Sequence, residues 1–153
     1  MHIMSKLDNK DTLIKHFPVP MESSFPVNVP YINRLHYSPK RPIESRMHYH
    51  DSTEIGICRC GSGVFYIGNQ VCPFSAGDVI VVSPGTIHIA HSDQQIAGWQ
   101  FIDIDYSCLA NKLPPGCADL AGNFNGVITK ESNSKIATLI DFLLQEFADT
   151  KPY

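Results

Sequence analysis

The sequence predicts an all-β domain, built as a small antiparallel sandwich or barrel, with a segment of different character at each end. Short β-favouring runs follow one another closely between residues 31 and 106, with no helical pattern between them. Turn residues close each run, and the Gly68-Asn69 pair is typical of a tight hairpin. We expect strands at Tyr31–Tyr37, Met47–Tyr49, Glu54–Arg59, Val64–Ile67, Gln70–Pro73, Val79–Val82, Ile87–His91 and Gly98–Tyr106.

The composition is that of an ordinary globular protein, and 153 residues suit one domain with a real core. The net charge of -3 gives no field that would draw this chain itself to nucleic acid or an anionic membrane. The five cysteines form no zinc-finger pattern, and no apolar leader or run of about 20 apolar residues is present. These features predict reduced thiols, a cytoplasmic location and no membrane-spanning segment.

Residues 1–30 predict an extended N-terminal arm that lies on the domain. Four prolines fall between residues 17 and 30, and proline interrupts both helices and central strands. The first four residues, Met-His-Ile-Met, resemble a cloning remnant and carry no weight in the fold prediction.

Residues 107–153 predict a loop followed by one helix. The prolines at 114 and 115 argue against regular structure in residues 107–130, and a helix is expected from about Lys135 to Ala148. Its apolar side chains recur at steps of three and four, at Ile136, Leu139, Ile140, Leu143, Leu144 and Phe147. Two interpretations stay open: the helix packs on its own barrel, or it forms a dimer seam or a hinge to another domain.

A set of metal-binding residue types begins in the second predicted strand. Side chains at even spacing share one face of a strand, so His48, His50 and Glu54 can all point inward. His88 is the best-placed fourth ligand from another strand. Such a set suits a divalent first-row metal, such as Zn, Ni, Fe or Mn, with room left for water or substrate. A His-x-His pair alone is more often structural, so the prediction depends on the whole set.

Other inward positions predict a binding cavity beside the metal. Arg46 could clamp an anionic ligand, and an ion pair at the barrel rim is its alternative role. Gly56 and Cys58 share the inward face and are small, so they would leave volume open. Three aromatic residues could stack on a ligand ring or instead fill the core: Tyr66, Trp99 and Phe101.

Two stretches together resemble the paired motifs of the cupin superfamily. They are His48-x-His50-x3-Glu54-x6-Gly61 and Gly77-x5-Ser83-Pro84-Gly85-x2-His88. The resemblance implies a double-stranded β-helix, or jelly-roll barrel, in which the three histidines and the glutamate bind metal. The sequence departs from the motifs at Pro42, Ser83 and Ser92, where the family has glycine, proline and asparagine. None of these positions is a ligand, although Pro42 and Ser83 imply altered turns at the barrel rim.

The order of the segments resembles the N-terminal effector-binding domain of AraC-type transcription regulators. These segments are Arg46–His50, Glu54–Ile57, Gly61–Ile67, Gly77–His88 and Gly98–Ile104, with a proline-rich arm before them and an apolar helix after them. The resemblance implies a small effector, often a sugar or an organic acid, in the barrel. It also implies a homodimer formed through the helix, and DNA binding only through a C-terminal helix-turn-helix domain.

The expected organisation is therefore an arm at 1–30, a cupin barrel at 31–106, and a loop with a dimerisation helix at 107–153. No basic recognition helix is found in the sequence, so we expect the helix-turn-helix domain to be absent from this chain. The expected function is effector sensing and dimerisation, with candidate effector contacts at Arg46, Cys58, Tyr66 and Trp99. A stand-alone metal-dependent cupin enzyme, a dioxygenase or a sugar isomerase, is the alternative, although no acid/base pair is evident beyond the ligands.

Overall fold

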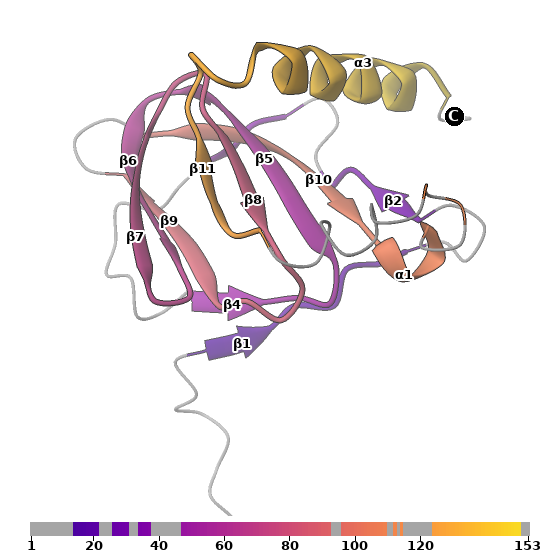
Figure 1. Cartoon of the computed structure of the whole chain (residues 1–153), viewed down its shortest axis with the longest axis horizontal. Coiled ribbons are helices and arrows are strands. Elements are labelled where there is room, and N and C mark those ends of the chain that lie inside the picture. The colour runs from indigo at the N-terminus through magenta and orange to yellow at the C-terminus, as the bar shows by residue number, and fades with distance from the viewer. Residues whose placement is uncertain are drawn as a thin grey trace, which may run out of the picture.

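The computed structural model describes residues 14–21, 26–30, 34–37, 47–92, 96–109, 112, 114 and 124–150. Within them, two β-sheets face each other and one long helix lies across one end of the pair, as Figure 1 shows. The predicted all-β fold with a C-terminal helix is confirmed. No helix among these residues is long and apolar enough to span a membrane.

Each sheet is assembled from strands far apart in the sequence. The five-stranded sheet has the order β1-β4-β9-β6-β7, with bounds β1 Ile14–His16, β4 Met47–Tyr49, β9 His88–Ser92, β6 Ser62–Ile67 and β7 Gln70–Ser75. The six-stranded sheet has the order β11-β8-β5-β10-β2, with bounds β11 Gly126–Ile128, β8 Val79–Val82, β5 Thr53–Cys60, β10 Gly98–Ile104 and β2 Val27–Asn28. Strand β3, His36–Tyr37, pairs with the other end of β10.

The central strands match the prediction closely, and the differences lie at the ends of the chain. The arm contributes two short strands, β1 and β2, and the expected loop at 107–130 contributes β11. These strands are only two or three residues long, so they carry too little alternation to be recognised in the sequence. Of the expected strand at 31–37, residues 31–33 lie outside the described residues.

Strand β10 ends two residues earlier than predicted, at Ile104. A four-residue helix, α1, follows at Tyr106–Leu109. The side chain of Asp105 explains this boundary, because its Oδ1 accepts the Ser107 backbone N–H at 2.9 Å, which is the bond of a helix N-cap.

Side chains alternate between the two faces of β5, and those of the two faces belong to different apolar clusters. Cys58 belongs to the cluster inside the barrel, with Phe65, Phe74 and Trp99. Ile57 points to the opposite face and belongs to a second cluster that also contains Val79 and Ile102, beneath the C-terminal helix. One strand therefore supplies both the lining of the barrel and the platform on which the helix packs.

Helix α3 spans Ser134–Thr150, slightly longer than predicted, and packs on its own barrel. Ile140 and Leu144 are buried against the outer face of the six-stranded sheet. At the start of the helix, the buried Asn133 amide donates to the carbonyl oxygens of Gly77 and Ile128, at 2.9 and 3.1 Å, and so fixes the helix to the barrel. Two residues of the predicted apolar face, Leu139 and Leu143, stay exposed, together with Phe142.

Candidate metal and effector site

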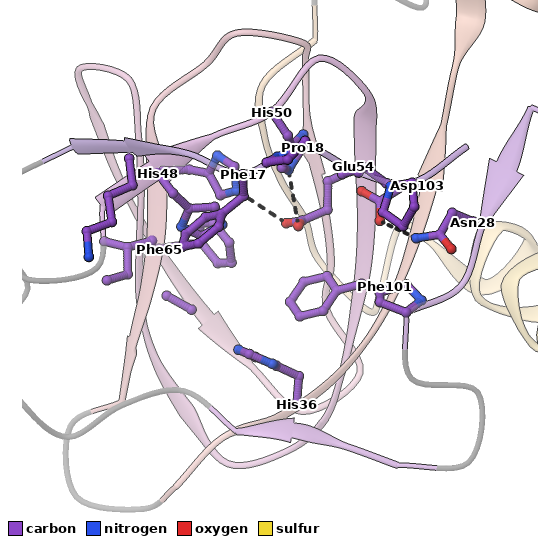
Figure 2. Close-up of a pocket in the computed structure, with 17 residues that line it drawn as sticks. Phe17, Pro18, Asn28, His36, His48, His50, Glu54, Phe65, Phe101 and Asp103 are labelled. Carbon is purple, nitrogen blue, oxygen red and sulfur yellow. Dashed lines mark hydrogen bonds and ion pairs between the residues drawn. The ribbon is translucent and has the colours of Figure 1, made fainter. Parts of the chain in front are cut away.

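The four predicted metal ligands meet at one point inside the barrel (Figure 2). One ligand atom from each of His48, His50, Glu54 and His88 lies within 4.8 Å of the other three. They come from β4, the turn after it, β5 and β9, and His48 stands directly opposite His88 in the antiparallel pair. The carbonyl oxygen of His50 accepts the Gly85 N–H at 2.8 Å, so the turn at 83–85 holds this part of the site in place.

Backbone carbonyl groups orient two of the imidazoles. Nδ1 of His50 lies 2.9 Å from the Ser52 carbonyl oxygen, and Nδ1 of His88 lies 2.7 Å from that of Thr86. Because a carbonyl oxygen can only accept, each ring carries its proton on Nδ1 and turns Nε2 into the cluster. Histidines that bind metals are commonly oriented in this way.

Each of these Nε2 atoms is buried and makes no hydrogen bond. The carboxylate of Glu54 lies between them, with Oε2 3.4 Å from Nε2 of His50 and Oε1 3.7 Å from Nε2 of His88. Two ligands that each lie about 2.1 Å from one tetrahedral ion are about 3.4 Å apart, so the observed spacings suit a shared cation better than direct hydrogen bonds.

The pKa values of Glu54 and His50 indicate that positive charge is favoured inside the cluster. Burial alone would raise the pKa of Glu54, but the neighbouring His88 and His50 hold that pKa well below its usual range. Burial lowers the pKa of His50, and this effect is outweighed by the neighbouring carboxylates of Glu54 and Asp103, so the pKa lies above its usual value. The ionised carboxylate therefore requires positive charge beside it, which either protons on the imidazoles or a metal ion can supply.

The residues present thus fit a divalent first-row metal. Three imidazoles and one carboxylate are ligands that such ions accept, and the buried Nε2 atoms without hydrogen bonds would gain a partner. His48, His50, Glu54 and His88 could hold the ion.

The cluster forms part of the wall of a cavity of about 590 Å³, a volume typical of small-molecule sites. The arm supplies another part of the wall, through Lys15 and residues 17–20, and strands β2 and β3 supply Asn28 and His36. Phe101 of β10 points into the cavity between His36 and Glu54, as Figure 2 shows. Segments of the arm and of β2, β3 and β10 therefore line one cavity together with the cluster.

Asp103 is a polar residue of the cavity wall that the sequence prediction missed. It is 4% exposed, and its Oδ1 accepts a hydrogen bond from Ser52 Oγ at 3.2 Å. The Asn28 amide lies 3.5 Å from its other oxygen. Burial and the negative charge of Glu54 raise the pKa of Asp103 to about 6. The sequence did carry a signal for this position. Asp103 lies two and four residues after Phe101 and Trp99, so it shares their face of β10, and it stands opposite Glu54 in β5.

The predicted effector contacts are not in this cavity, as far as the structure describes them. Cys58 and Trp99 lie in the packed core, at 1% and 0% exposure, and Tyr66 is absent from the described cavity wall. Arg46 lies outside the described residues. The expected open volume at Gly56 is filled, because a Cβ built there would be 2.6 Å from the Phe101 ring. One half of the barrel interior is thus solid core, and the cavity occupies the other half.

Comparison with known proteins places the middle of the chain in a family. Residues 40–107 match the family model of the AraC-like ligand binding domain. This segment is an AraC-like ligand-binding domain. The two facing sheets of the whole described chain, with the C-terminal helix, form the cupin-like arrangement that the two motifs predict.

Solved structures similar to the AraC-like domain include a regulator, an enzyme and a further cupin. The AraC-like transcriptional activator CuxR is 16% identical over 66% of this chain and 35% of that chain, with a TM-score of 0.45. Oxalate decarboxylase from Bacillus subtilis is 20% identical over 40% of this chain and 17% of that chain, with a TM-score of 0.37. A cupin protein from Bacteroides fragilis is 18% identical over 48% of this chain and 53% of that chain, with a TM-score of 0.33.

The chain spans about a sixth of the oxalate decarboxylase chain and about a third of the CuxR chain. No curated protein matches the chain at a significant level.

The reactivity of the Cys58 thiol tests whether this residue lies in the packed core. Burial raises the pKa of Cys58 to about 12, whereas Cys60, two residues later, is exposed. The thiolate is the reactive form, so we expect iodoacetamide at pH 8 to modify Cys60 and leave Cys58 unmodified in the folded protein. Peptide mass spectrometry measures both sites, and urea-unfolded protein is the control in which both should react. Equal modification of the two in folded protein would place Cys58 at an accessible wall instead.

Proposed function

We propose that this chain is the effector-sensing domain of an AraC-type transcription regulator, and that it binds a small metabolite in the cavity beside a divalent metal ion. DNA would be bound by a helix-turn-helix domain outside this chain. The observation that carries the proposal is the cavity itself, with four potential metal ligands and a buried carboxyl group in its wall. The match to the AraC-like ligand binding domain supports a binding role for that cavity.

Each part of the cavity wall has a distinct role in this proposal. When bound, a divalent ion would supply a Lewis-acidic position for an oxygen atom of the effector. Asp103 and Asn28 would accept and donate hydrogen bonds on the side away from the cluster, and Phe101 would contact the carbon skeleton of the effector. The arm residues 17–20 would touch an effector directly, so binding would shift the equilibrium between docked and released arm.

The apolar residues left exposed on α3 support a homodimer. Leu139, Phe142 and Leu143 are 62%, 58% and 38% exposed and lie on the side of the helix away from the barrel. Side chains three and four positions apart form one stripe on a helix, and such a stripe gains stability when a second copy covers it. In the proposed regulator, this contact would join two DNA-binding domains.

Replacing Phe142 with Glu should weaken the dimer at least about tenfold, because the carboxylate would have to be desolvated in an apolar contact. Light scattering after gel filtration, over a range of protein concentrations, measures the effect. The matched control is Val71→Glu, a similarly exposed apolar residue on β7, at 60% exposure. A wild-type chain that stays monomeric at high concentration, or a Val71→Glu variant that dissociates equally, would argue against this surface.

Isothermal titration of the metal-loaded chain with pentoses, hexoses, uronic acids and small carboxylates tests the sensing role. We expect one class of compound to bind, and Phe101→Ala to weaken that binding because the residue lines the cavity. Absence of binding throughout a broad panel, together with absence of a dimer, would overturn the regulator proposal.

Asp103 favours a second candidate function, a metal-dependent enzyme. A buried carboxyl group in the cavity wall, across the strand pair from Glu54, is the acid/base group that the sequence did not reveal. Metal-loaded protein that consumed dioxygen or interconverted an aldose and a ketose, with loss of turnover in Asp103→Asn, would favour the enzyme. Tight binding of an effector without turnover would favour the sensor.

A further inference from the structure

Strand β4 carries His48, and His50 follows it directly, yet the structure holds this strand loosely on one side. β4 is three residues long, and His48 and His88 are its one residue pair with β9 among the described residues. On its other edge it pairs with β1 of the arm through three consecutive residue pairs, Ile14 with Met47, Lys15 with His48 and His16 with Tyr49. The arm therefore contributes more strand pairing to this ligand-bearing segment than the barrel does.

Beyond β1, the arm continues to contact the ligand strand. The Phe17 backbone N–H donates to the Tyr49 carbonyl oxygen at 2.9 Å. The Phe17 ring meets the His48 ring edge to face, with centroids 5.1 Å apart, and His48 in turn lies 4.3 Å from the His88 ring. Figure 2 shows Phe17 beside His48 at the cavity wall. An aromatic side chain in this position restricts the rotation of the His48 imidazole.

Little apolar surface secures β1 and Phe17 otherwise, whereas the later part of the arm is anchored by the buried Val29. All three β1 residues are exposed, and Phe17 is itself 48% exposed. The His16–Asp51 ion pair, at 3.0 Å, is also exposed and adds little stability. A strand held by few buried contacts detaches at a low free-energy cost, so a modest stabilisation is enough to change how often it is docked.

We infer that the N-terminal arm is a component of the metal centre: β1 and Phe17 position His48 for metal binding, and a bound metal in turn holds the arm on the barrel. This inference rests on the metal site of the proposed function. The two effects are linked, since a docked arm that raises metal affinity by some factor must itself be stabilised by metal by that same factor. Phe17 is a positioning residue here, because it acts on the metal through the His48 ring.

Zinc titration with a chromogenic competitor tests the inference on the wild type and five variants. We expect Phe17→Ala to weaken zinc binding about tenfold, within the usual range of such couplings, and Phe17→Trp to restore it. Removal of residues 1–17 should weaken binding at least as much, whereas removal of residues 1–13, which leaves β1 in place, should not. Val71→Ala on β7 is the control for loss of an exposed apolar side chain, and thermal unfolding of each metal-free protein separates positioning from a loss of stability.

Hydrogen exchange measured by mass spectrometry gives the reciprocal readout on the intact chain. Zinc should slow exchange of the amides at 15–17 in the wild type and have a smaller effect in Phe17→Ala. Wild-type affinity in both Phe17→Ala and the 1–17 deletion, with no zinc effect on arm exchange, would overturn the role of the arm and leave the metal site intact. A wild-type chain that binds no zinc would overturn both.

Discussion

Replacing Glu54 with Gln should lower the affinity of the chain for a divalent ion by roughly 100-fold or more, a loss larger than that typical for a residue that only supports a metal ligand. The substitution removes the carboxylate whose two oxygens lie 3.4 and 3.7 Å from the Nε2 atoms of His50 and His88. An amide keeps the shape of the side chain but supplies no charge to balance the ion. Competition titration with zinc, manganese and nickel measures the loss.

The matched control is Glu131→Gln, which removes the same charge at an exposed position next to α3. This variant should bind metal like the wild type, because an exposed charge far from the cluster is screened by solvent. If Glu54→Gln bound metal as tightly as Glu131→Gln does, the carboxylate would be no ligand, and its position between the imidazoles would be purely structural.

Replacing Trp99 with Ala destabilises the folded chain by about 3–5 kcal/mol, the range observed for the loss of a large buried aromatic side chain. Trp99 is fully buried and is surrounded by aromatic rings: Phe74 at 4.7 Å, Phe65 at 5.5 Å and Phe101 at 5.8 Å between centroids. Its removal leaves a cavity that these rings fill only in part. Urea unfolding followed by circular dichroism measures the change in the free energy of unfolding.

Trp99→Phe should recover much of the lost stability, because most of the buried apolar surface is retained. Tyr37→Ala removes an aromatic side chain that is 57% exposed and should cost much less. A Trp99→Ala protein as stable as Tyr37→Ala would contradict the packed half of the barrel and would return Trp99 to the list of candidate effector contacts.

The cluster of potential metal ligands could be predicted from the spacing of its residues along the chain. His48, His50 and Glu54 were predicted from their even spacing on one strand, whereas in the structure residues 50–52 separate β4 from β5, and the three side chains converge from two strands and the turn between them. His88 was found through its distance from the turn at 83–85, and in the structure Gly85 does bind the His50 carbonyl oxygen. The spacing therefore identified the residues of the cluster but not the elements that carry them.

The lining of the cavity was harder to predict than the cluster, because alternation gives the face of a strand and not the position along it. Cys58 and Trp99 do point inward, and they lie in the packed half of the barrel and not in the cavity. Phe101 and Asp103, on the same strand as Trp99, reach the cavity. Which inward residues face empty space depends on how the two sheets approach each other, and that information is spread over the whole chain.

The arm strands were missed for a related reason. β1 and β2 are pairing partners of β4 and β10, and their sequences carry almost no signal of their own. Short edge strands of this kind form because a neighbouring strand offers free backbone groups, so their position is a property of the fold.

Metal analysis of the purified chain shows most directly whether His48, His50, Glu54 and His88 form a metal centre. The protein should be produced without a histidine tag, dialysed against zinc, freed of excess ion and measured by elemental analysis, beside His48→Ala and His88→Ala. We expect about one ion per wild-type chain and a large reduction in both variants. Metal content that is negligible in the wild type, or unchanged in both variants, would contradict a metal centre at His48, His50, Glu54 and His88.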